Sequence, residues 1–180
     1  MHVRQGGSGS ATELLFMLDS DVPPQQVFKN RDSGAEWFFA MTADDQFKVS
    51  RNGTGKVEAK FFDNGNLQIA GTLIQASDVN AKTGMAPVDA SAVLEAVADL
   101  DISTWQYDSE PGVTHLGPTS QDFAAAFGLG DTTTGIASVD ADGVALAAIQ
   151  ALAAENDELR SRNASLAARL TRLETAVSGG

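Results

Sequence analysis

Residues 145–177 read ALAAIQALAAENDELRSRNASLAARLTRLETAV, and this stretch decides the architecture. Written as a heptad, its d positions are occupied by Ala145, Leu152, Leu159, Leu166 and Leu173. Its a positions are occupied by Ile149, Asn156, Asn163, Leu170 and Val177. Sustained a/d spacing over several heptads is typical of a coiled coil. The sequence therefore predicts a long helix that associates with copies of itself.

The charged residues of this segment favour a parallel arrangement of the helices. In a parallel coiled coil, a g residue faces the e residue five positions later on the neighbouring helix. This rule pairs Glu155 with Arg160 and Arg169 with Glu174, so both encounters are attractive. The two asparagines at a positions weaken the seam and select its register, but they do not set the number of chains. A solitary amphipathic helix packed on its own domain is the alternative.

Composition excludes several classes of protein. The 180 residues carry 24 acidic and 12 basic side chains, a net charge of −12, and no cysteine. Disulfide frameworks, thiolate metal sites and cysteine nucleophiles are therefore excluded. The acidic balance argues against a nucleic-acid partner, because that binding depends on clustered Lys and Arg. The longest apolar run, residues 14–18, is far shorter than the roughly 20 residues of a membrane span, and we expect neither a membrane partner nor a signal peptide.

The N-terminal part of the chain has the texture of short β-strands. Residues 1–10 are rich in glycine and predict a flexible leader. Between residues 36 and 73, apolar residues recur at even spacing, at Phe47, Val49, Val57, Ala59, Phe61, Leu67, Ile69 and Leu73. Asn52-Gly53 and Asn64-Gly65 have the chemistry of tight hairpins. These stripes are too narrow to close a core of any size, so we expect the segment to pack against partners.

A small α+β unit is expected after a loop at residues 75–89. Asp89 is a candidate N-cap for a helix whose apolar face holds Val93, Leu94, Val97 and Leu100. Residues 102–107 read as a strand, and residues 112–118 read as a loop that contains His115. A second helix is expected to begin at Thr119 or Ser120, to carry Phe123 and Phe127, and to end at Gly128 or Gly130.

Cofactor chemistry has no support in the sequence. The glycines lack the strand, loop and helix context of a phosphate-binding motif. Asp140 and Asp142 could form a hard-cation pair, but acidic residues at the start of a long helix are explained by its macrodipole. We therefore expect no metal and no cofactor.

Ser77 and Lys82 form a candidate catalytic pair. A serine hydroxyl becomes a nucleophile when a base removes its proton, and a neutral lysine can be that base. In an irregular loop a spacing of five can bring the amine back to the hydroxyl, whereas in a regular strand it would place them on opposite faces. Ser77-Asp78 could equally form a turn or a helix cap. Spacing alone leaves the choice open.

A series of short motifs resembles one known domain. They are, in order, SDVNAK (77–82), PVD (87–89), ISTWQY (102–107), HLGP (115–118), QDF (121–123) and DADGVALAAIQ (140–150). This order is similar to that of the C-terminal intramolecular chaperone and autoprocessing domain of phage tailspike endosialidases, which occurs also on other phage fibres, bacterial surface proteins and the myelin regulatory factor. The resemblance covers about residues 77–177.

The resemblance implies a domain that trimerises, guides the folding of the fibre before it, and then cuts itself away in a single turnover. The severed bond would be Ala76–Ser77, with Ser77 as the nucleophile and Lys82 as the general base of a serine peptidase. His115 would support proton transfer or shape its loop, or be merely structural. The partners implied are two further copies and the chain's own N-terminal segment, which is both folding client and substrate. Assembly in the cytoplasm would be followed by location on a virion tail fibre or a bacterial surface.

The expected protein is α+β and homotrimeric. It comprises a leader (1–10), a β-rich stalk (11–76), the chaperone domain (77–144) and a parallel coiled coil (145–177). The first alternative is a trimerisation module that folds its cargo without cutting. A receptor-binding tip is a further reading, although the N-terminal part shows no receptor-binding module. Trp37-Phe38-Phe39 could form a sugar-stacking surface or plug an interchain core.

Overall fold

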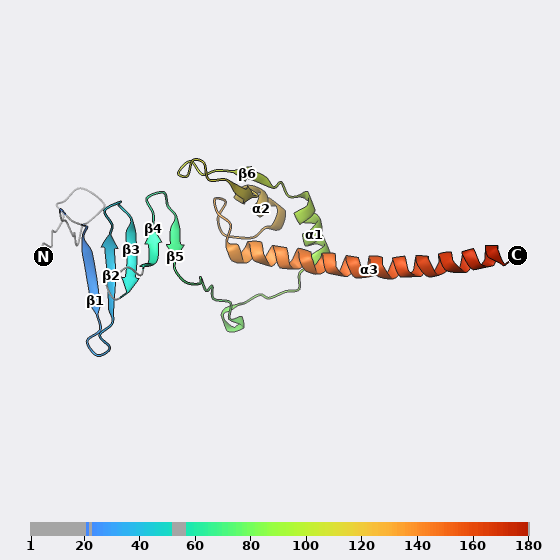
Figure 1. Ribbon diagram of the computed structural model, residues 1–180, viewed down its shortest axis with the longest axis horizontal. Coiled ribbons are helices and arrows are strands. Elements are labelled where there is room, and N and C mark those ends of the chain that lie inside the picture. The colour runs from blue at the N-terminus through green and yellow to red at the C-terminus, as the bar shows by residue number, and fades with distance from the viewer. Residues whose placement is uncertain (1–20, 22, 52–56, 180) are drawn as a thin grey trace. The chain divides into compact units, whose positions relative to one another are not determined.

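The computed structural model describes residues 21, 23–51 and 57–179. The chain divides into two compact units. The first comprises the residues up to Ile74 together with Asp108–Pro111, and the second comprises Gln75–Tyr107 and Gly112–Gly180. The first unit holds an antiparallel sheet and the second holds the α-helices, as Figure 1 shows. The α+β class expected from the sequence is confirmed.

The sheet of the first unit is an antiparallel meander of five strands. In chain order they are β1 (Gln25–Lys29), β2 (Glu36–Met41), β3 (Phe47–Arg51), β4 (Val57–Phe61) and β5 (Leu67–Ile69). The predicted turn at Asn64-Gly65 joins β4 to β5: the Asn64 side chain accepts a hydrogen bond from the Asn66 amide at 3.0 Å, and Gly65 has a φ of 91°. The turn predicted at residues 52–53 lies outside the described residues.

The strand β1 was not expected from the sequence. Its residues QQVFK contain only two apolar side chains, Val27 and Phe28, and these are adjacent, so no alternation is visible. It forms because β2 offers a complete partner, from Gln25 opposite Ala40 to Lys29 opposite Glu36. The Lys29 amine also donates to the Glu36 carboxylate at 2.6 Å. Pairing with a neighbour, rather than local propensity, makes this strand.

Both short helices of the second unit lie where their capping residues predict. The helix α1 (Ala90–Asp99) is capped by the Asp89 carboxylate, which accepts hydrogen bonds from the amides of Ser91 and Ala92. The helix α2 (Ser120–Phe127) has Thr119 as its N-cap and ends at Gly128, whose φ of 63° is left-handed. These two predictions are confirmed because capping chemistry is local to the sequence.

The expected loop at residues 112–118 is partly a strand. Residues His115–Gly117 form β7, which pairs antiparallel with β6 (Ser103–Trp105), so that Trp105 lies opposite His115. The prediction of an irregular loop around His115 was therefore wrong. The residues of β7 carry no alternating pattern of their own, and the pairing with β6 decides their conformation.

The helix α3 (Ser138–Ser178) is a single unbroken element of 41 residues. It begins seven residues before the heptad segment that starts at Ala145, so it also runs through the boundary expected at residues 144/145. Its buried residues, Val144, Ala148 and Ala151, lie in its first four turns, where α3 packs against α1. From residue 152 to residue 178 every position is exposed. The long helix is confirmed, and the parallel trimer stays a prediction.

Candidate functional site

The candidate site lies on an exposed arm that joins β5 to α1. Every residue from 70 to 89 is exposed, and the only regular element of the arm is a single 3₁₀ turn, η1 (Val79–Ala81). Asp78 caps this turn. Its carboxylate accepts hydrogen bonds from the Asn80 backbone amide and from the Asn80 side-chain amide, each at 2.9 Å. The cap thus makes a compact reversal in an otherwise extended segment.

The reversal brings the two candidate catalytic side chains together. The Lys82 Nζ donates a hydrogen bond to the Ser77 Oγ at 2.7 Å. This distance lies within the range required between a nucleophile and its base. A spacing of five residues suffices here because η1 turns the chain back between Ser77 and Lys82. Both side chains are exposed in the single chain.

A second contact anchors the arm on the other side of Ala76. The Gln75 side-chain amide donates to the Ser138 hydroxyl, at the first residue of α3, at 2.6 Å. The segment that contains the Ala76–Ser77 bond is therefore held at both ends. Gln75 is hydrogen-bonded to the start of α3, and Asp78 caps η1. Sequence reasoning missed this contact, because nothing local to Gln75 signals a partner 63 residues away. The turn itself could have been predicted from Asp78, because an aspartate side chain often accepts a hydrogen bond from the backbone amide two residues later, which forms an Asx turn.

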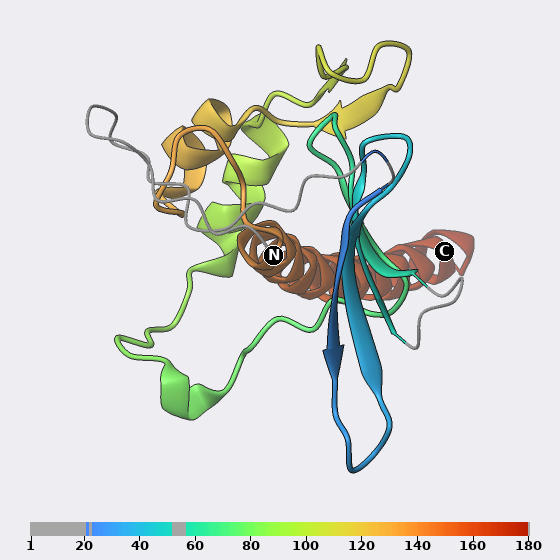
Figure 2. The same cartoon turned by 90° about the vertical axis from the view of Figure 1, so that its left-hand side faces the viewer.

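His115 belongs to an aromatic cluster at the β6–β7 hairpin. Its ring stacks on Trp105 with centroids 4.8 Å apart and an interplanar angle of 24°, and Tyr107 meets it edge-on at 5.4 Å. Trp105 and Tyr107 also contact each other at 4.8 Å. Figures 1 and 2 both place the β6–β7 hairpin on the opposite side of the second unit from the turn η1. His115 therefore anchors the hairpin, and its supporting role in catalysis stays a prediction.

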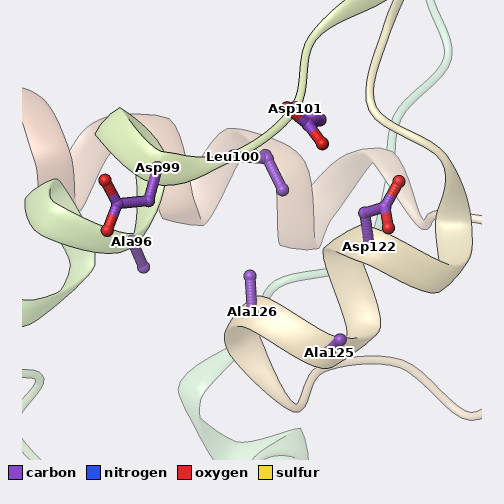
Figure 3. A pocket seen from close by; sticks show the side chains of 7 residues that line it. All are labelled: Ala96, Asp99, Leu100, Asp101, Asp122, Ala125 and Ala126. Carbon is purple, nitrogen blue, oxygen red and sulfur yellow. The ribbon is translucent and has the colours of Figure 1, made fainter.

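A shallow hollow between α1 and α2 is lined by three carboxylates, but it is not a metal site. Figure 3 shows Asp99, Asp101 and Asp122 spread around the hollow, with no common point on which their oxygens converge. The Asp122 carboxylate is already engaged by the Thr119 hydroxyl at 2.6 Å. Within the described ranges, no group of three or more His, Cys, Asp or Glu side chains is placed to hold a metal ion. Asp140 lies in the first turn of α3, where the helix dipole favours a negative charge.

None of the helices in the part of the chain that the structure describes has both the length and the apolar character of a bilayer span.

Comparison with known families supports the resemblance seen in the sequence. Residues 77–128 match the peptidase S74 family, which is described as chaperone of endosialidase. The match begins at Ser77 and ends at Gly128, the C-cap of α2, so it spans the arm from its candidate nucleophile onward, α1, the β6–β7 hairpin and α2. No curated protein matches the chain. The resemblance to an intramolecular chaperone domain is thus confirmed for residues 77–128, and it supports a chaperone role.

Proposed function

Because residues 77–128 match the chaperone of endosialidase family, we propose that this chain is an intramolecular chaperone with a self-cleaving activity. It assembles as a parallel homotrimer through α3, promotes folding of the β-rich segment before Ser77, and then cuts the Ala76–Ser77 bond. The observation that supports the cleavage is the 2.7 Å hydrogen bond between the Lys82 amine and the Ser77 hydroxyl.

The cleavage follows from the chemistry of this pair. The Ser77 Oγ attacks the carbonyl carbon of Ala76, and its proton passes to the neutral Lys82 amine. The C–N bond between Ala76 and Ser77 breaks as the Ser77 nitrogen takes a proton, which leaves Ala76 joined to the Ser77 oxygen as an ester. Water then hydrolyses the ester, releasing the Ala76 carboxylate and restoring the Ser77 hydroxyl, now at a new N-terminus. Each chain turns over once, because the scissile bond is adjacent to its own nucleophile.

Assembly is the step that makes the pair competent. A lysine acts as a base only when neutral, and removal from water favours the neutral form. In the single chain Ser77 and Lys82 face solvent, as does the rest of the arm from residue 70 to residue 89. The arm also exposes Leu73, Ile74, Val79, Met85 and Val88, each by at least 60%. Contact of these apolar side chains with neighbouring copies would cover the arm and exclude water from the pair.

The order of events explains why a chaperone of this design would help a β-rich client. Sheets formed between chains have high contact order and expose strand edges while they search for register. A coiled coil forms fast and locally, and it holds three client segments at high effective concentration. Cutting after folding removes the nucleating domain, so the client is kinetically trapped in its assembled state. A client of this kind fits a fibre on a virion or a bacterial surface, which is the location we propose.

Mass spectrometry of the purified full-length chain tests the cleavage. The expected products are residues 1–76 and 77–180. Ser77→Ala and Lys82→Ala should each leave the chain intact, while Asp78→Ala should slow cleavage because it removes the cap that holds η1. Ser91→Ala is the matched control: this serine is exposed and only its backbone amide is used, at the Asp89 cap. Cleavage that survives both Ser77→Ala and Lys82→Ala would overturn the mechanism.

The second candidate is a trimerisation module that folds the same client without cutting it. The complete exposure of the arm favours this alternative, because both Ser77 and Lys82 face solvent in the single chain. Sedimentation equilibrium combined with mass spectrometry separates the two functions. An intact wild-type chain at three times the chain mass supports the module, and two fragments support the peptidase.

A further inference from the structure

One face of the N-terminal sheet carries a continuous row of aromatic rings. Phe28 contacts Phe39 with ring centroids 5.5 Å apart, Phe39 contacts Phe47 at 6.3 Å, and Phe47 contacts Phe61 at 6.0 Å. The row crosses β1, β2, β3 and β4, and Leu67 of β5 lies opposite Phe61 in register. We call this surface the aromatic face; it comprises Phe28, Trp37, Phe39, Phe47, Phe61 and Leu67.

The aromatic face is open to solvent in the single chain. Phe28 is 52% exposed, Phe61 48% and Leu67 55%, and even the two central phenylalanines are 37% exposed. Aromatic side chains of this size dominate the free energy of burial in cores and interfaces. A row of them left in water across a whole sheet marks an interaction surface rather than a set of scattered apolar residues.

Charge separates this face from the reverse face. Side chains alternate along a strand, so the residues between those of the aromatic face point the other way. The reverse face carries Lys29 paired with Glu36, and Lys48 directly opposite Lys60. Among the strand residues paired in register, the polar members on the aromatic side are Gln26, at the edge strand, and Arg51, at the end of β3. The one charged member, Arg51, lies at the end of its strand and pairs with Glu58 at 3.7 Å, so the aromatic rows of two identical faces can meet without bringing like charges together.

We propose that the aromatic face is the interchain core of the N-terminal segment, covered in the assembly by the same face of two further copies. This inference rests on the proposed homotrimer and deepens it. The occupant is a copy of this chain because the same chain carries a self-complementary heptad seam, whose Glu155–Arg160 and Arg169–Glu174 encounters are attractive between copies. Any coiled coil that gathers three copies also raises the local concentration of three such faces.

A saccharide fits the same surface less well. Binding of a sugar needs polar groups placed between the rings to orient its hydroxyls. The hollow beside Phe28, Phe39 and Phe47 offers Gln26 as its polar side chain, with Pro24, Ala40 and Met41 completing its lining. The tripeptide Trp37-Phe38-Phe39 is also divided by the sheet: Trp37 and Phe39 lie on the aromatic face, and Phe38 lies on the reverse face.

Single-cysteine variants test this inference cleanly, because the chain contains no cysteine. Phe47→Cys places a thiol on the aromatic face, and Lys48→Cys, one residue further along β3, places a matched thiol on the reverse face. Both are made in the full chain with Ser77→Ala, so that neither depends on cleavage. The measurements are the sedimentation mass, the rate of reaction with a large maleimide, and crosslinking between chains by a short bis-maleimide.

The expected result is a trimeric mass with a thiol at position 47 that crosslinks between chains and reacts at least about tenfold more slowly than the thiol at position 48, because it reacts only on transient opening. A trimer in which both thiols react equally fast would overturn the inference and leave the proposed function standing. A monomer with a shielded thiol at position 47 would overturn both proposals and would show that the aromatic face is covered within the chain itself. A monomer with two reactive thiols would overturn both proposals.

Discussion

The two parts of α3 treat their apolar side chains in opposite ways. In the first four turns, Val144, Ala148 and Ala151 are buried against α1, with exposures of 9%, 7% and 5%. From residue 152 to residue 178 every position is exposed, and Leu159, Leu166 and Leu173 are 54%, 57% and 64% exposed. Within one chain, α3 therefore buries its smaller apolar residues and leaves the leucines of the heptad exposed to solvent.

The buried and the exposed apolar residues of α3 lie on different faces of the helix. In the heptad, Val144 and Ala151 fall at c positions and Ala148 at a g position, so the buried stripe lies beside the a/d seam and does not use it. One face of α3 can pack on α1 while the adjacent seam stays available to copies of the chain. The alternative of a solitary helix packed on its own domain describes only the first turns, because every later residue of α3 that the structure describes is exposed.

The largest effect is expected from a charge in the open seam. Leu159→Asp would place a carboxylate at a d position of every copy. It should lower the stability of the assembly by at least the cost of losing a buried leucine, about 2–5 kcal/mol per chain. Sedimentation equilibrium should show the mass of a single chain, and circular dichroism should show loss of helix beyond residue 151. Cleavage at Ala76–Ser77 should fail with it.

Ser161→Asp is the control for this variant, because Ser161 lies at the f position, farthest from the seam. It should keep the wild-type mass. A Leu159→Asp chain that also keeps the wild-type mass would show that the heptad seam is not the assembly surface.

A smaller and different effect is expected on the buried stripe. Ala151→Leu adds three carbons where α3 meets α1, and overpacking of this kind costs about 1–3 kcal/mol. Hydrogen exchange should accelerate in α1, and the thermal midpoint should fall, while the sedimentation mass stays unchanged. Ala154→Leu, at an exposed f position three residues further on, should change neither. Dissociation of the assembly by Ala151→Leu would instead show that the buried stripe and the a/d seam are not independent.

How far the sequence predicts the structure depends on how local each feature is. The Asp89 cap, the Gly128 stop and the unbroken α3 were predictable because capping and heptad periodicity are local patterns. The strands β1 and β7 were not predictable, since each is made by its partner strand rather than by its own residues. The same limit applies to the site. The spacing of Ser77 and Lys82 left their contact undecided, and the Asp78-capped turn between them determines it.

A substitution within the seam, at Asn156, should have an intermediate effect. Asn156 at an a position donates its side-chain amide to the Leu152 carbonyl of its own helix at 2.8 Å, and so it brings little apolar surface to a partner. Asn156→Leu should raise the stability of the assembly by on the order of 1 kcal/mol per chain. It should also broaden the distribution of assembly states, because a buried amide selects register. Native mass spectrometry measures the distribution, and a narrower one would contradict the role assigned to Asn156.

The smallest effect is expected from the charges that flank the seam. Glu155→Lys turns the encounter with Arg160 of a neighbouring copy from attraction into repulsion, worth about 0.2–1 kcal/mol per exposed pair. The loss should shrink at high salt, because exposed charges are screened. Within its own chain Arg160 contacts Asp157 at 3.1 Å, and this competing partner further reduces the effect. The double variant Glu155→Lys with Arg160→Glu should restore the wild-type thermal midpoint in a parallel coil, whereas an antiparallel coil would show no such rescue.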